Sequence, residues 1–268
     1  MLRYPAVAGT FYPADPKELS TMVADCARPD SGHPAAPYRA CMVPHAGYRY
    51  SGRLAGEVLG RVLLPERILL LGVRHFPRGE ECAILRAGSW RTPLGDAPVD
   101  ERLAAEVLRA CPMLRDDPVA HKSEHSLEVQ LPFLQSLRPG FRFVPMALGT
   151  LDFPTLTALG RGLGEILAKD PELFLLTTSD FNHYESEEVT RQKDQLAIER
   201  ILSLDPRGLY DVCRKHKVSM CGLGPAVSML TALLAAGAGQ AELVRHATSA
   251  EVSGDTRSVV GYAELLFR

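Results

Sequence analysis

The stretch Ile68-Leu69-Leu70-Leu71-Gly72-Val73-Arg74-His75 joins an apolar run to a polar end, and this pattern decides the fold class. Short apolar runs bounded by Pro and Gly are typical of buried strands in a parallel sheet. Two further runs, 40–43 and 173–176, precede His45 and the pair Asp180 and His183. In open α/β sheets, ligands bind beyond the carboxyl ends of the strands. We therefore expect these polar residues to meet in one crevice.

The composition predicts a folded protein and argues against some classes of binding partner. The chain has 268 residues, and 46% of them are hydrophobic, which is enough for a sizeable core. Its net charge of -2, with both signs interspersed, gives no electrostatic reason to expect nucleic acid or a membrane surface. No apolar stretch is long enough to span a membrane, and the N-terminus lacks the apolar region of a signal peptide. Six cysteines without CxxC pairs predict reduced thiols in the cytoplasm and argue against a zinc finger.

Strand-like and helix-like patterns alternate along the chain. We expect strands at 39–43, 67–71, 82–86, 141–148, 173–178, 241–247 and 258–266, and helices at 17–26, 52–63, 100–110, 124–137, 153–167, 187–202, 206–216 and 224–235. Residues 29–37 predict a loop and 89–95 a turn. The order predicts one α/β domain over 1–268, with a central mixed, mainly parallel sheet and helices on both faces. The last two strands are expected to add antiparallel edges.

His45 and His75 each follow a strand, which makes both candidate metal ligands. Pro44 precedes His45, and Ala46 and Gly47 follow it, so a ligand can approach the backbone closely. A single histidine in such a place is usually hydrogen-bonded into a turn. The repeated placement favours a shared role, because two neutral imidazoles form half of a metal site.

Asp180 and His183 lie three residues apart beyond a strand and are candidates for acid/base chemistry. The carboxylate can orient the imidazole, or both can lie on one cavity wall. The alternative is that Ser179 or Asp180 caps a turn and that His183 is exposed.

Cys221 lies between Met220 and Gly222, just before an apolar helix. A lone cysteine is most often an inert buried residue, but a metal facing the histidines would hold it as a thiolate. Glu124, His125 and Glu128 form a second group, either supporting the metal ligands or capping a helix, and capping is slightly favoured. Tyr48 and Trp90 are candidates to line a substrate pocket, although packing is the more common role for either.

Several motifs in order give the chain a resemblance to a known family. They are Ala8–Pro13, Val43–Tyr48, Leu71–His75, Arg91–Gly95, Glu124–Glu128, Thr178–His183 and Cys221-Gly222. Together they closely resemble the Memo-like proteins (AmmeMemoRadiSam system protein B type). That family is similar in fold to class III extradiol dioxygenases, which implies the same fold here.

The resemblance implies roles for individual residues. His45 and His75 match the two metal histidines, and His183 matches the acid/base histidine, with Asp180 beside it. Cys221 falls where the dioxygenases have a glutamate. A thiolate is softer than a carboxylate and also suits copper or zinc, so ring cleavage does not follow from the resemblance. Phe76 replaces a further histidine of some relatives, which sharpens the choice of His75.

Three functions remain open at this point. The first is a redox enzyme that holds Fe(II) or copper through His45, His75 and Cys221, with His183 moving the proton. The second is a non-enzymatic protein whose pocket binds a ligand or a peptide, with Arg49, Arg74 and Arg91 available for an anionic group. The third is a zinc hydrolase. The resemblance also implies a radical SAM protein and a small companion protein as partners.

Overall fold

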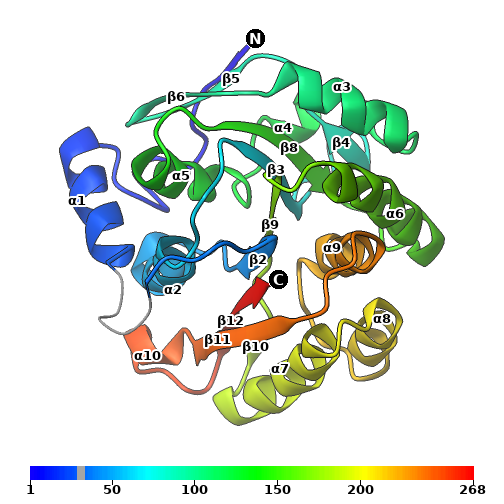
Figure 1. Cartoon of the computed structure of the whole chain (residues 1–268). Helices are drawn as coiled ribbons and strands as arrows, with labels where there is room; N and C mark the ends of the chain where they lie inside the picture. The colour runs from blue at the N-terminus through cyan, green and yellow to red at the C-terminus, as the bar shows by residue number, and fades with distance from the viewer. Residues whose placement is uncertain (29–33) are drawn as a thin grey trace.

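A mixed nine-stranded sheet runs through the centre of the protein (Figure 1). The structure is a computed structural model and describes residues 1–28 and 34–268. Eight strands follow one another in the order β10 (His183–Glu185), β12 (Val259–Phe267), β2 (Ala40–Val43), β9 (Phe174–Thr178), β3 (Arg67–Val73), β8 (Arg142–Leu148), β4 (Cys82–Ile84) and β7 (Arg115–Asp116). The ninth strand, β11 (Ala241–Thr248), also pairs with β12. The expected mixed α/β sheet is confirmed.

The four central strands β2, β9, β3 and β8 are all parallel. Their register aligns Val43 at the end of β2 with Thr178 at the end of β9. Leu71 of β3 pairs with Thr177 of β9, so β3 ends close to the same level. The segments that follow these strands therefore begin at one edge of the sheet.

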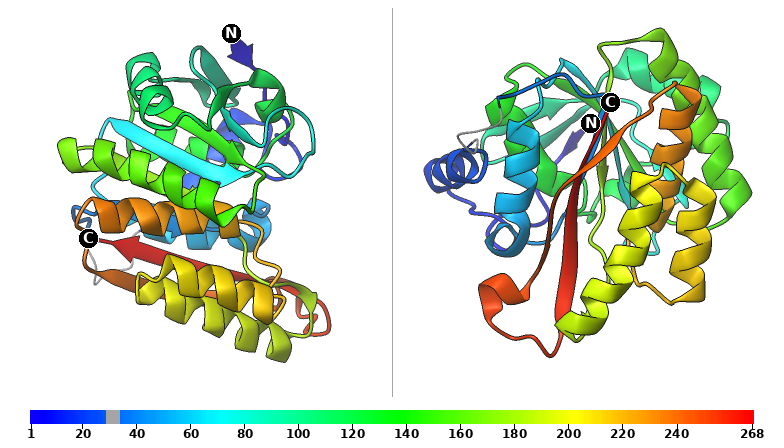
Figure 2. Two further views of the ribbon diagram at one scale, coloured as in Figure 1. Left: turned by 90° about the vertical axis from the view of Figure 1, so that its right-hand side faces the viewer. Right: turned by 60° about the horizontal axis from the view of Figure 1, so that its bottom comes forward.

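Helices cover both faces of the sheet (Figure 2). One face carries α1 (Pro16–Cys26), α2 (Tyr48–Gly60) and α5 (Leu131–Leu137). The other carries α3 (Glu101–Ala110), α6 (Phe153–Lys169), α7 (Glu187–Leu202), α8 (Pro206–Lys215) and α9 (Leu223–Ala235). Short helices α4 (Pro118–His121) and α10 (Ala250–Ser253) and the 3-10 turn η1 (Glu128–Gln130) complete the order. None of the described helices is long and apolar enough to cross a membrane.

The position of strand β3 between two layers of helices explains why its sequence is apolar throughout and does not alternate between apolar and polar residues. Leu69 and Leu71 pack in the core beneath α6 and α9, whereas Ile68 and Leu70 pack in the core beneath α2 and α5. All four are completely buried. A strand with helices on both faces needs apolar side chains at every position.

The helix expected at 52–63 begins earlier and ends earlier, at Tyr48–Gly60. Gly52 and Gly56 lie inside it, and a Cβ at Gly56 would lie 2.5 Å from the backbone carbon of Cys26. These glycines allow α1 and α2 to pack closely; they do not mark a helix boundary.

The first part of the helix expected at 124–137 is absent, and helical structure begins at Glu128, a start that Pro132 favours because proline is tolerated only near the beginning of a helix. Residues 122–127 form an irregular segment, followed by η1 and α5. The Glu124 carboxylate accepts a hydrogen bond from the Ser126 N–H, 2.8 Å away. Such local bonds compete with helix formation. Pro132 lies in the first turn of α5, where its missing N–H costs nothing.

Two more differences come from long-range pairing. The expected turn at 89–95 is a hairpin of β5 (Ser89–Thr92) and β6 (Gly95–Pro98), which forms a separate sheet with β1 (Leu2–Arg3). The C-terminal strand β12 lies inside the large sheet between β2 and β10, so it is not an edge. Residues 29–33 of the expected loop lie outside the described residues.

Candidate metal centre

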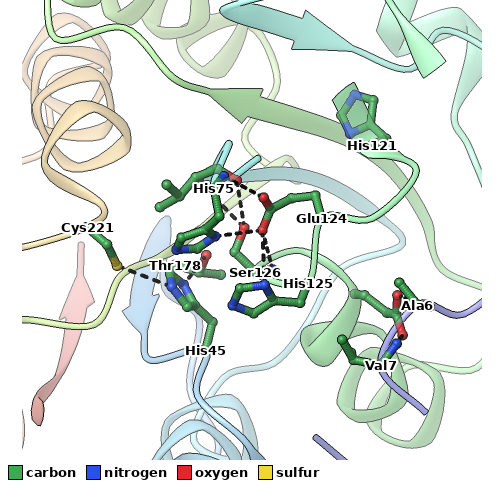
Figure 3. A network of polar contacts seen from close by, with 12 residues as sticks. Ala6, Val7, His45, His75, His121, Glu124, His125, Ser126, Thr178 and Cys221 are labelled. Atoms are coloured by element: carbon green, nitrogen blue, oxygen red, sulfur yellow. Dashed lines mark hydrogen bonds and ion pairs between the residues drawn. The ribbon is translucent and has the colours of Figure 1, made fainter. Parts of the chain in front are cut away.

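His45 is held on both sides of its ring at the end of β2. Its backbone N–H donates to Asp180 Oδ1 over 2.8 Å, and its Nδ1 lies 3.0 Å from Thr178 Oγ1. Its Nε2 lies 3.2 Å from the sulfur of Cys221 (Figure 3). The residue is almost completely buried. The pairing of β2 with β9 brings Thr178 to this position, so the sheet itself orients the imidazole.

His75 is oriented by Glu124. The Glu124 carboxylate accepts from the His75 backbone N–H over 2.7 Å, and its other oxygen lies 2.9 Å from His75 Nδ1 (Figure 3). Burial alone would raise the pKa of Glu124, but the hydrogen bond and charge of His75, together with Ser126 N–H and His125, lower it to about 2. The ionised carboxylate only accepts hydrogen bonds, so in the neutral ring His75 Nδ1 carries the proton and Nε2 keeps a free lone pair.

Cys221 completes the group from the segment before α9. Its sulfur accepts a hydrogen bond from the Asp180 N–H at 3.3 Å. The ligating atoms of His45, His75 and Cys221 all lie within 4.8 Å of one another. Two imidazoles and one thiol at this separation can hold a metal ion with a position left for another ligand. The residues present therefore fit a metal.

Two pKa shifts bear on that fit. Burial, with the nearby charge of His75, lowers the pKa of His45 to about 3, so its imidazole is neutral at physiological pH, as a metal ligand must be. Burial and the Asp180 carboxylate raise the pKa of the Cys221 thiol. A bound cation would reverse that second effect, because metal coordination deprotonates a thiol.

His125 is a third imidazole at the site. Its ring stacks on that of His75, with centroids 4.4 Å apart, and lies 5.7 Å from the ring of His45. Together with His75 and Glu124 it forms a second group of atoms spaced for a metal. Burial and the neighbouring His45 lower the pKa of His125 to about 4, so it too is neutral.

Asp180 and His183 lie at the same site but have different partners. Asp180 holds the His45 backbone, whereas His183 Nδ1 lies 2.9 Å from the carbonyl oxygen of Ser219. A carbonyl only accepts, so Nδ1 carries the hydrogen and Nε2 is left unprotonated in the neutral ring. The described residues contain no hydrogen bond between Asp180 and His183, so the backbone of Ser219 orients that imidazole.

A cavity of about 640 Å³ opens over these side chains. It is lined by His45, His75, His125, Asp180 and His183, by Phe11, Ala46, Gly47, Tyr50 and Tyr184, and by Ser249, Ser253, Asp255, Ser258, Val260 and Tyr262. Its size lies within the usual range for small-molecule sites, roughly 300–1,000 Å³. All the imidazoles of the centre therefore face a space that can hold a small molecule.

Known proteins resemble this chain over almost its whole length. Residues 3–266 match the Memo-like protein family. The chain belongs to the Memo-like family. A MEMO1 family protein of Methanopyrus kandleri is 40% identical over 281 residues, covering 100% of this chain and 99% of the relative. A MEMO1 family protein of Aquifex aeolicus is 36% identical, with 99% of each chain covered.

The fold of this Memo-like chain also occurs at much lower sequence identity. The crystal structure of an uncharacterized protein of Escherichia coli K12 is similar with a TM-score of 0.57 and 12% identity. The similarity covers 84% of this chain and 98% of the other. At this identity the likeness concerns the fold alone.

Two aromatic residues, Trp90 and Tyr48, lie away from the candidate metal centre. Trp90 is completely buried, with the Arg3 guanidinium 4.1 Å from its ring centroid. Tyr48 stacks on Phe133, and its hydroxyl donates to the Val129 carbonyl over 2.6 Å. Neither lines the cavity; both pack in the core.

Sequence reasoning assigned no role to three residues that build the centre. The Thr178 hydroxyl contacts Nδ1 of His45. The Ser126 hydroxyl donates to the Val73 carbonyl over 3.0 Å and so holds the end of β3, two residues before His75. Ser219 holds His183. The available signal was that Thr178 and Ser126 lie inside the motifs Thr178–His183 and Glu124–Glu128, beside candidate site residues. Ser219 gave none.

Proposed function

We propose that the protein is a metal-dependent redox enzyme acting on a small molecule, with non-haem iron or copper held by His45, His75 and Cys221. The convergence of these three ligating atoms within 4.8 Å carries the proposal. Such a metal would supply a site for O₂ or for a reduced substrate and would exchange electrons with it. The thiolate suits copper, and the two imidazoles suit either metal.

The chain's own residues would position the substrate and move a proton. The cavity of about 640 Å³ supplies three tyrosines, Tyr50, Tyr184 and Tyr262, as a partly aromatic wall. His183 would accept a proton at Nε2, because Ser219 holds the hydrogen on Nδ1. Asp180 would fix the His45 backbone and so the ligand geometry.

One observation favours a second candidate function. A thiolate with two imidazoles is also a donor set found in catalytic zinc sites, where the fourth position holds water. In that case His183 would serve as the base of a hydrolase. Metal content separates the two proposals, because zinc does not exchange electrons.

The test begins with protein purified without added metal. We expect close to one iron or copper ion per chain and, with that metal, oxygen uptake on a panel of catechols and related reduced small molecules. Zinc as the resident metal, without oxygen uptake after reloading with iron or copper, would contradict the redox proposal.

Two histidine variants sharpen this test. His183→Ala should keep the metal and lower turnover about 10²–10⁴-fold, because it removes only the acid/base group. His216→Ala is the matched control, since His216 is an exposed residue at the end of α8. Loss of metal in His183→Ala would make His183 a ligand.

The radical SAM protein and the small companion protein expected as partners stay predictions.

A further inference from the structure

A second cavity, of about 500 Å³, lies on the other side of the segment that carries Cys221. It is lined by the end of β3 (Val73, Arg74), the loop after β8 (Leu148, Gly149, Thr150, Leu151), the end of α8 and the segment after it (Cys213, Arg214, Lys217, Val218, Ser219, Met220, Cys221) and the start of α9 (Leu223, Gly224, Pro225). Of the three proposed metal ligands only Cys221 lines this space, and the cavity proposed for the substrate is a separate one.

The charge of this cavity has one sign. Arg74, Arg214 and Lys217 line it, and no aspartate or glutamate does. Across residues 1–28 and 34–268, none of the three cations forms an ion pair within 4.0 Å. The Arg74 guanidinium donates a hydrogen bond to the Gly79 carbonyl, and the Arg214 guanidinium lies 5.5 Å from the centroid of the Tyr210 ring. Arg74 Nε is buried and has no acceptor among the described residues.

The start of α9 adds two unpaired backbone donors to the same cavity. Gly222, the N-cap, makes no side-chain capping bond. Within the described part of the chain, neither Leu223 N–H nor Gly224 N–H has an acceptor. The N–H groups of a first helical turn point out of the helix end, where they favour an anion.

We propose that this cavity binds the phosphate group of a small ligand, either free phosphate or a phosphate monoester. Three cations and two free N–H groups match the charge of -1.5 to -2 and the three acceptor oxygens that a phosphate monoester carries at about pH 7. Arginine and lysine both bind phosphate in this way, arginine through its planar fork and lysine as a point charge. The site goes beyond the proposed function, because the two cavities share no lining residue.

The experiment is a calorimetric titration of inorganic phosphate into the full chain at constant ionic strength, which measures the affinity for phosphate. The parent should bind phosphate saturably, and Arg214→Gln/Lys217→Asn should bind it at least about tenfold more weakly, because two charge-assisted contacts are lost. Asparagine suits position 217, whose φ is 52°. The control Lys215→Gln/Lys122→Gln removes the same charge from exposed residues that do not line the cavity, and should bind phosphate within about twofold of the parent.

Metal-stripped and metal-loaded protein should give the same affinity. Binding that requires the metal, equal weakening in the control, or no saturable binding would each overturn the proposal. A parallel titration with glycerol 3-phosphate identifies the source of the group: tighter binding than inorganic phosphate assigns an ester, and equal binding assigns the free anion. The single variant Arg214→Gln, checked by melting temperature, replaces the double variant if that one folds poorly.

Discussion

Both oxygens of the Glu124 carboxylate bind the same residue, His75: one accepts its backbone N–H over 2.7 Å and the other lies 2.9 Å from its ring Nδ1. The carboxylate is completely buried and ionised. It therefore fixes both the position of the main chain after β3 and the orientation of the His75 ring in the candidate metal centre.

This relationship predicts the effect of Glu124→Gln on metal affinity. The amide keeps the shape of the carboxylate but weakens its hold on Nδ1, so affinity should fall about 10- to 100-fold. Competition with a chromophoric chelator measures it. Glu106→Gln, a partly exposed carboxylate on α3, is the control and should leave affinity unchanged. Unchanged affinity in Glu124→Gln would remove Glu124 from the support of the centre.

Cys221→Ser should abolish tight copper or zinc binding while the chain stays folded. Serine is nearly isosteric with cysteine, but its neutral hydroxyl is a much poorer ligand for these metals than a thiolate. Metal stoichiometry and melting temperature are measured on one sample. Cys111→Ser is the control, because Cys111 is completely buried away from the centre. It should cost about 1–3 kcal/mol of stability with normal metal content. Lower stability with normal metal content in Cys221→Ser as well would exclude the Cys221 thiol as a metal ligand.

Glu264 predicts a pH dependence of folding. Burial, with the nearby Glu57, raises its pKa to about 9, and neither of its oxygens has a partner among the described residues. The group is protonated in the fold, whereas the unfolded chain ionises near its ordinary value of 4.5. The contribution of the protonated Glu264 carboxyl to the free energy of unfolding is therefore fully present below pH about 4.5 and is lost as the pH rises towards 9.

Glu264→Gln should remove this dependence. The free energy of unfolding of the variant, relative to the parent, should rise by up to about 1.4 kcal/mol per pH unit across that interval. Urea unfolding of both proteins at pH 5, 7 and 8.5 measures the difference. A constant difference over that range would mean that Glu264 is ionised in the fold and has a partner or water.

The N-terminal segment depends on Glu128. Its carboxylate pairs with Arg3, accepts the Ala6 and Val7 N–H groups over 2.8 and 3.1 Å, and accepts the Tyr12 hydroxyl over 2.6 Å. Glu128→Ala leaves the buried Arg3 uncompensated and should cost about 3–5 kcal/mol. Chemical denaturation measures this loss, and tryptic cleavage after Arg3 should become faster. A loss below about 1 kcal/mol would show that Arg3 finds another partner.

The sequence alone determined the local elements and the residue types of the centre. The apolar runs at β2, β3 and β9 predicted buried strands. Asp15 and Pro16 are residues that favour a helix start, and the Asp15 carboxylate accepts two N–H groups at the start of α1. The position of His45 and His75 after parallel strands placed them at one sheet edge. These features depend on neighbouring residues, so a linear pattern carries them.

Only the tertiary structure decided which side chains touch. Asp180 binds the backbone of His45, 135 positions away, and not His183, three positions away. Trp90 packs under Arg3 because β1 pairs with β5, and β12 lies inside the sheet because its outer edge accepts β10 and β11. Such partners follow from strand register and long-range packing. A one-residue change in register turns every side chain of a strand to the opposite face, and local sequence patterns do not encode this choice.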